Sequence, residues 1–141
     1  MKPVEYYKGR EQTYLKHFFL ERYLERVAYH IGYYHREFVY VDCFSGPWRA
    51  EDEELGDTSI RIALDRLNQV RKRLAQLQKY PTIRAIFVER SAAAFSTLEQ
   101  TLQEHRGEVK TTAFLGTFEE NISRILNEIG SMFTFVFVDP T

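Results

Sequence analysis

The apolar run from Phe38 to Val41 restricts the fold of this sequence more than any other feature, because it ends in an acid and a short loop. The residues that follow are Asp42-Cys43-Phe44-Ser45-Gly46-Pro47-Trp48. A strand covered on both faces of a parallel sheet shows a continuous apolar run instead of an alternating one. In open α/β sheets, ligands bind just beyond the carboxyl ends of the strands. The run therefore predicts a buried strand that opens into a ligand loop.

Apolar runs of strand length alternate with amphipathic helical patterns along the chain. Further strands are expected over residues 83–88, 109–115 and 133–138. Helices are expected over residues 11–31, from Asp57 or Thr58 to residue 77, and over 92–105 and 118–129, with Gly32 ending the first. This alternation predicts right-handed βαβ units and a mostly parallel α/β sheet. We expect a Tyr-rich helical segment over residues 1–36 and an α/β domain over residues 37–141.

The fourth expected strand lies three residues from the end of the sequence and is nearly all apolar. An unpaired apolar strand at a sheet edge invites aggregation, so native sheets rarely leave one exposed. We therefore expect the chain to be the N-terminal half of a larger domain, truncated after this strand. The edge at residues 133–138 is expected to pair with the missing half or with another copy.

Bulk composition limits the classes of partner. The formal net charge is −1, so nothing at the level of the whole chain indicates attraction to nucleic acid or to a membrane surface. A single cysteine excludes an internal disulfide framework, and no signal-peptide pattern is visible, which predicts a cytoplasmic protein. No apolar stretch is long enough to span a bilayer.

Tyrosines and basic residues are interleaved in the first 36 residues, a combination that can bind single-stranded nucleic acid by stacking and phosphate contact. Four glutamates in the same stretch dilute its charge, which favours a helix that docks a partner or covers the sheet. The histidines there lack the cysteine or paired carboxylate that would complete a ligand set, so no metal site is expected. Cys43 is expected to be a small packed residue and not a nucleophile.

Each expected strand ends in an acid or a glycine, and these ends should line one edge of the sheet. They are Asp42 with Gly46, Glu89, Gly116-Thr117 and Asp139-Pro140. An acid after the second strand can accept hydrogen bonds from both hydroxyls of a ribose. The chain lacks G-x-G-x-x-G, and Glu89 follows Asp42 by far more than the roughly 20 residues of a dinucleotide fingerprint. The pattern therefore favours a smaller nucleoside ligand.

Residues 38–141 resemble the class I methyltransferases that use S-adenosylmethionine, which carry an acid and glycines after the first strand and an acid after the second. More narrowly, the chain resembles the three-Cys-motif partner proteins. These are bacterial genomic partners of a radical-type protein with a three-cysteine motif. The matching segments are Lys16-His17, Leu20-Glu21-Arg22-Tyr23-Leu24 and Val41-Asp42-Cys43-Phe44-Ser45-Gly46-Pro47.

The resemblance implies a Rossmann-like fold, S-adenosylmethionine as cofactor, methyl transfer, and the radical-type protein as a partner. Within the first loop, it implies that Asp42, Phe44, Ser45 and Gly46 bind the cofactor, with Asp42 and Gly46 beside its methionine part. The residues implied elsewhere are Glu89 at the ribose, Thr117 and Phe118 at the adenine, and Asp139 and Pro140 at the catalytic edge, where related enzymes orient an extruded base amine.

Each of these assignments also has a purely structural alternative. Asp42 and Gly46 also suit a strand-ending turn, and Glu89 could cap the helix that starts near Ala92. Asp139-Pro140 could simply end a strand. Trp48 stands where the resembling family has a second glycine, and its side chain could fill cofactor space. The alternative function is therefore a catalytically silent partner protein that keeps the fold and docks through its N-terminal helix.

Overall fold

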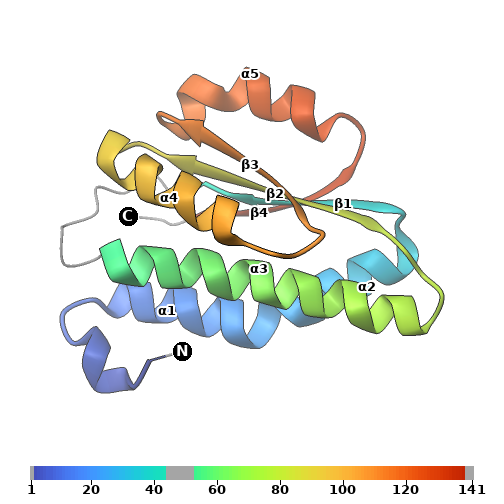
Figure 1. Ribbon diagram of the computed structural model, residues 1–141, viewed down its shortest axis with the longest axis horizontal. Coiled ribbons are helices and arrows are strands. Elements are labelled where there is room, and N and C mark those ends of the chain that lie inside the picture. Colours follow the sequence, from blue (N-terminus) through green and yellow to red (C-terminus); the bar gives the residue numbers. More distant parts are fainter. Residues whose placement is uncertain (1, 44–52, 139–141) are drawn as a thin grey trace.

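The structure is a computed structural model and describes residues 2–43 and 53–138, with side chains from residue 59 onward in the second range (Figure 1). The chain begins with a 3-10 turn η1 (Val4–Tyr7) and three consecutive helical segments, α1 (Glu11–Phe19), η2 (Leu20–Leu24) and α2 (Glu25–Tyr34). Strands and helices then alternate as β1 (Glu37–Asp42), α3 (Glu53–Gln76), β2 (Thr82–Glu89), α4 (Ala92–Glu104), β3 (Lys110–Leu115), α5 (Phe118–Ile129) and β4 (Phe133–Phe137).

The four strands form one parallel sheet in the order β3-β2-β1-β4. In the register of β1, Phe38 lies opposite Ile83 of β2 and Phe133 of β4. Residues Phe38 to Asp42 are all buried, as expected of a central strand covered on both faces. This topology confirms the predicted α/β class and is Rossmann-like.

Helices cover the two faces of the sheet unequally, with α1 to α4 on one side and α5 on the other (Figure 1). Alternate side chains of β1 supply both cores, since Phe38 and Tyr40 pack in the larger cluster and Val39 and Val41 pack in the cluster around Ile125 of α5. The chain therefore changes face between the β1–β2 connection and the β3–β4 connection. This change creates a topological switch between β1 and β4.

The first helix is longer and less regular than the sequence predicts. The expected end at Gly32 is wrong, because α2 continues to Tyr34 and Gly32 lies inside it. A Cβ at Gly32 would sit 2.7 Å from Cδ1 of Leu74, so the glycine permits close packing of α2 against α3. The middle segment η2 is a π-helical turn, and its Leu20 and Leu24 are completely buried in the larger core.

The start of α3 also differs from the prediction. The helix begins at Glu53, before the expected caps Asp57 and Thr58, and includes the acidic residues Glu53 and Glu54. Acidic residues are favourable in the first turn of a helix, where the macrodipole is positive. The helix therefore starts before Asp57 and Thr58, because the acidic residues that precede them also favour a first helical turn.

No helix in the two described ranges combines the length and apolarity needed to cross a bilayer. The edge strands of the described sheet are β3 and β4, and Val136 of β4 is 42% exposed.

Candidate functional site

The carboxyl ends of β1, β2 and β3 lie along one edge of the sheet, here called the carboxyl edge. Asp42 ends β1 and Glu89 ends β2, two residues beyond the position that pairs with Asp42. Leu115 of β3 pairs with Glu89, and the amide of Gly116 donates to the carbonyl of Glu89 at 2.8 Å. The structure therefore brings together the described members of the predicted set.

The Glu89 side chain is buried at the amino end of α4. Glu89 is 5% exposed, and its Oε1 accepts a hydrogen bond from the amide of Ser91 at 2.9 Å. The helix cap is Ser91, whose Oγ accepts from the amide of Ala94 at 3.3 Å. A carboxylate has about four acceptor positions, so it can accept from more than one donor. The adjacent helix terminus favours its negative charge.

The loop after β3 is held in a fixed conformation by side chains of α5. Gly116 has φ +121°, a conformation that favours glycine, and a Cβ there would lie 2.8 Å from Oε2 of Glu120. Asn121 is 3% exposed and donates from Nδ2 to the carbonyls of Leu115 at 3.0 Å and Thr117 at 2.9 Å. The space left by the missing side chain of Gly116 is therefore occupied by Glu120 and Asn121 of α5.

The resemblance implies that Thr117 and Phe118 approach an adenine. In the structure both residues make contacts that stabilise α5. The hydroxyl of Thr117 accepts from the amide of Glu120 at 3.1 Å and caps the helix. Phe118 is half-buried and packs against the smaller core cluster. These contacts fix both residues at the carboxyl edge beside Gly116.

Asp42 forms a buried ion pair with Lys16 of α1. Nζ of Lys16 lies 3.1 Å from each carboxylate oxygen, and the two side chains are only 4% and 2% exposed. The ammonium also lies 5.6 Å from the ring centroid of Phe137 in β4. The helix α1 is thereby anchored to the end of β1, next to the topological switch.

A second buried polar contact lies beside this pair. His17 is fully buried, and its Nδ1 lies 2.7 Å from the hydroxyl of Tyr7 in η1. Burial raises the pKa of Tyr7. The sequence singled out Lys16-His17 as a matching segment but assigned no role to either residue, because a partner 26 positions away leaves no signal in local spacing.

Two further groups near the end of β1 stay protonated at neutral pH. Burial raises the pKa of Tyr40 well above its ordinary value, and the charge of Asp42 acts in the same direction. Burial and the same carboxylate raise the pKa of Cys43 to about 12. The thiol is therefore a neutral packed group, unsuited to nucleophilic attack. Tyr40 Oη is buried and has no hydrogen-bond partner in the described part of the chain.

Several predicted site residues lie outside the described residues. They are Phe44, Ser45, Gly46, Trp48, Asp139 and Pro140. Their assignments remain predictions.

Of three comparisons with known proteins, two found no match and one found an alignment with a solved structure. The chain matches no protein-family model and no curated protein. A solved structure of loganic acid methyltransferase with SAH aligns with a TM-score of 0.41 and 18% identity, covering 67% of this chain and 27% of that chain. The aligned part is thus about a quarter of that protein. The Rossmann-like fold described here rests on the strand order and the placement of the helices.

Proposed function

We propose that the carboxyl edge binds an adenosyl cofactor, S-adenosylmethionine in the first place, and that the protein transfers a methyl group to an acceptor still to be identified. The observation that carries the proposal is the buried carboxylate of Glu89 at the end of β2, beside Gly116. A ribose offers two neighbouring hydroxyl donors, and a carboxylate can accept both.

The position of the edge supports the same proposal. In open α/β sheets the ligand crevice lies outside the carboxyl ends of the strands, where the connections change face. Here that point is between β1 and β4, where Asp42 ends β1, and the amino end of α4 follows the neighbouring strand β2. Helix amino ends and a preformed loop favour the polar parts of a nucleoside ligand.

The described residues fit such a ligand unevenly. Glu89 places a buried carboxylate at the end of β2, whereas the space beside Gly116 is taken by Glu120 and Asn121. Asp42 has its carboxylate engaged by Lys16 and almost no exposed surface. In the proposed site Asp42 therefore acts as a positioning residue, holding α1 and the end of β1 together.

S-adenosylmethionine, when bound, would supply an electrophilic methyl group on a sulfonium. The contribution of the protein is then to bind, orient and exclude water, which requires no activated nucleophile. The neutral Cys43 thiol is compatible with this chemistry. Asp139 and Pro140 are proposed to orient the acceptor.

Membership of the three-Cys-motif partner family, with its radical-type protein as partner, is part of the proposal. It is supported by the buried ion pair of Lys16 with Asp42, which joins the first and the third of the matching segments of the sequence. The second candidate function is a non-catalytic interaction module. The observation in its favour is the Lys16–Asp42 pair, which removes one predicted ligand contact from the site.

Calorimetric titration of the full-length protein with S-adenosylmethionine and S-adenosylhomocysteine separates the two functions. We expect micromolar binding, weakened about tenfold or more in Glu89→Gln, because hydrogen bonds to a charged acceptor are stronger than those to an amide. Glu99→Gln, an exposed position on α4, is the matched control and should bind normally. Absence of binding to the intact protein would leave the interaction module as the function.

A further inference from the structure

The exposed side of α2 carries aromatic and basic side chains. Arg26, His30, Tyr33 and Tyr34 recur at the spacing that places residues on one side of a helix. All four are exposed, whereas the buried residues of α2 lie on its opposite side. Together with Lys79, which follows α3, they form a surface that we call the α2 strip.

The printed distances join the rings and the lysine of the strip into one surface. The ring centroids of Tyr33 and Tyr34 are 5.0 Å apart, and those of His30 and Tyr34 are 5.2 Å apart. Nζ of Lys79 lies 4.3 Å from the ring centroid of Tyr33. The ammonium is therefore one ring away from Tyr34, so a phosphate close to a base on Tyr34 can reach it.

Tyr34 is the ring of the strip that is available for stacking. Arg73 of α3 lies over Tyr29, with Cζ 4.5 Å from the ring centroid, and Lys79 lies over Tyr33. Among the described residues no cation lies over Tyr34, which is 70% exposed. An exposed aromatic ring beside basic groups is the combination that binds single strands, because every base has a face that can stack.

The strip carries positive charge and no acid. Residues 26–36 include two arginines and two histidines but no acidic residue, and the next acid is Glu37 at the start of β1. Arg26, Arg36 and Lys79 form no ion pair with any residue that the structure describes. Their charges remain available to an anion.

Two of the glutamates that dilute this charge in the sequence are paired with α3. Glu21 and Glu25 both form ion pairs with Arg66, and Glu25 also pairs with Arg73. These carboxylates are thus compensated within the protein and lie before the strip in the chain. The local charge therefore favours a polyanion more than the sequence composition indicates.

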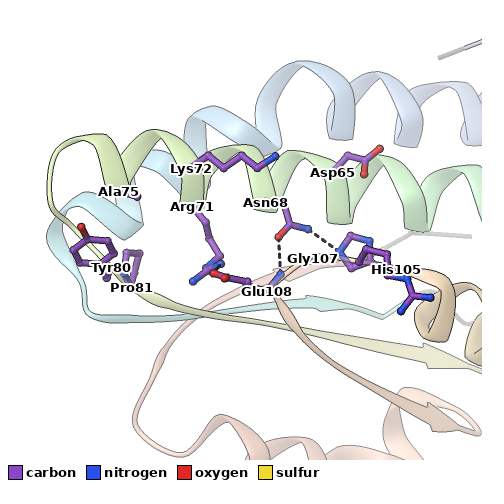
Figure 2. Close-up of a pocket in the computed structure, with 11 residues that line it drawn as sticks. Asp65, Asn68, Arg71, Lys72, Ala75, Tyr80, Pro81, His105, Gly107 and Glu108 are labelled. Carbon is purple, nitrogen blue, oxygen red and sulfur yellow. Dashed lines mark hydrogen bonds and ion pairs between the residues drawn. The ribbon is translucent and has the colours of Figure 1, made fainter.

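A second surface with basic side chains lies close by at the amino edge of the sheet, where the strands begin. A cavity of about 560 Å³, here called the amino-edge groove, lies between α3 and the segment before β3. Tyr80 lies at one end of it, beside Pro81, whereas His105 lies at the other end near Asp65 (Figure 2). The exposed ring of the groove thus stands apart from His105, whereas in the α2 strip a cation touches the neighbouring ring.

The wall of the amino-edge groove is held by Asn68 of α3. Its Oδ1 accepts from the amide of Glu108 at 3.2 Å, and its Nδ2 donates to Nε2 of His105 at 2.7 Å (Figure 2). Gly107 permits this approach, since a Cβ there would lie 2.2 Å from Nδ2 of Asn68. Arg71 and Glu108 form an ion pair on the same wall. These polar groups are engaged with one another, so the groove supplies matched controls for the strip.

We infer that the α2 strip binds single-stranded nucleic acid, with a base stacked on Tyr34 and phosphates at Lys79 and Arg26. Arg26 lies about 12 Å from Tyr34 along the helix axis, a length that a short strand spans. A duplex offers the same phosphates, but its bases are stacked on one another and leave Tyr34 without a partner. An acidic protein would likewise pair with the cations and leave this ring unused.

The strip is separate from the proposed cofactor site. It ends at Tyr34, just before the amino end of β1, whereas Glu89 lies at the carboxyl end of β2. The six residues of β1 span about 20 Å between these edges. The inference therefore does not rest on the proposed function.

Fluorescence anisotropy with labelled oligo(dT) and oligo(U) and the full chain tests the stacking. We expect both probes to bind, and Tyr34→Ala to weaken binding about tenfold. Tyr34→Phe keeps the ring face and should bind normally. Tyr80→Ala removes a ring of similar exposure, 73%, from the amino-edge groove and is the matched control, with no expected effect.

The salt dependence of the same binding tests the phosphate contacts. Each neutralised phosphate of a single strand contributes about 0.7 to the slope of log K against log salt. Lys79→Gln and Arg26→Gln should therefore each lower that slope by about 0.7. Lys72→Gln, an exposed lysine that lines the amino-edge groove, should leave it unchanged. Thermal unfolding of each variant checks that the fold is retained.

Further outcomes would overturn the inference. They are the absence of binding by both single strands, equally tight binding of a duplex of the same length, and normal binding by Tyr34→Ala. Losses in Tyr80→Ala or Lys72→Gln equal to those of the strip variants would also overturn it. Glu89→Gln must leave strand binding unchanged while it weakens S-adenosylmethionine binding, so this inference and the proposed function fail separately.

Discussion

The two edges of this sheet hold their charges in opposite ways. At the carboxyl edge, Lys16 and Asp42 form a pair that is almost completely removed from solvent. At the amino edge, Arg71 pairs with a Glu108 that is 77% exposed, and Lys72 and Arg106 face solvent. Burying a charge is expensive unless its partner is present, whereas a surface pair contributes little to stability. The first arrangement therefore fixes structure, and the second leaves charge available to a ligand.

The sharpest test of this difference is removal of one cation at each edge. Lys16→Met leaves Asp42 buried without its partner and is expected to lower the free energy of unfolding by about 3–5 kcal/mol. Arg71→Met should lower it by less than about 1 kcal/mol, because the pair it breaks is largely solvated. Urea unfolding of both variants measures the two values. Equal losses would show that the buried pair has no special structural role.

Two asparagines provide the next comparison, because each holds one end of β3. Asn121, which fixes the loop after β3, is 3% exposed, whereas Asn68, which fixes the segment before it, is half-buried. Asn121→Ala leaves the carbonyls of Leu115 and Thr117 without this donor and should lower the free energy of unfolding by about 1–3 kcal/mol. Asn68→Ala should lower it less, since water can replace the lost bonds. The reverse order in urea unfolding would contradict the assigned burial.

The last comparison concerns alkaline pH at the carboxyl edge. Cys43 has its pKa raised from 9.0 to about 12, so the folded thiol stays protonated while the unfolded thiol ionises. The unfolded state then binds fewer protons, and the free energy of unfolding should fall as pH rises from 9 towards 12. Tyr40, whose pKa is also raised, adds to the fall above pH 10.

Comparing the wild type with Cys43→Ala across this range isolates the thiol. Below pH 9, iodoacetamide should also react more slowly with the folded protein than with the protein in denaturant. Equal alkylation rates would mean that Cys43 is accessible.

The sequence predicts this fold well where the signal is local. Apolar runs locate all four strands to within about a residue, and the periodicity of α5 predicts both its ends. Local rules fail at Gly32 and at Asp57, where a residue typical of a helix end lies inside a helix because tertiary packing or its neighbours override it. The acids that end β1 and β2 were also predictable, since strand ends follow from the apolar pattern.

Long-range pairings could not be predicted in the same way. Lys16 reaches Asp42 only because of the orientation of α1, and Asn68 meets His105 across 37 positions of sequence. Neither contact belongs to a motif with fixed spacing. The amino-edge groove has no counterpart in the sequence patterns for this reason, although each of its residues was visible.

The π-helical turn from Leu20 to Leu24 has a consequence for the rotational phase of the whole N-terminal helix. The buried residues Leu20, Leu24 and Ala28 recur every four positions, whereas a regular α-helix repeats every 3.6. The wider turn absorbs that mismatch, so α1 and α2 can present their buried sides to the same sheet. Deleting one residue there would turn α1 by about 100° relative to α2. Lys16 would then point away from Asp42. The presence of one residue in this turn therefore determines how the helix is aligned with the carboxyl edge.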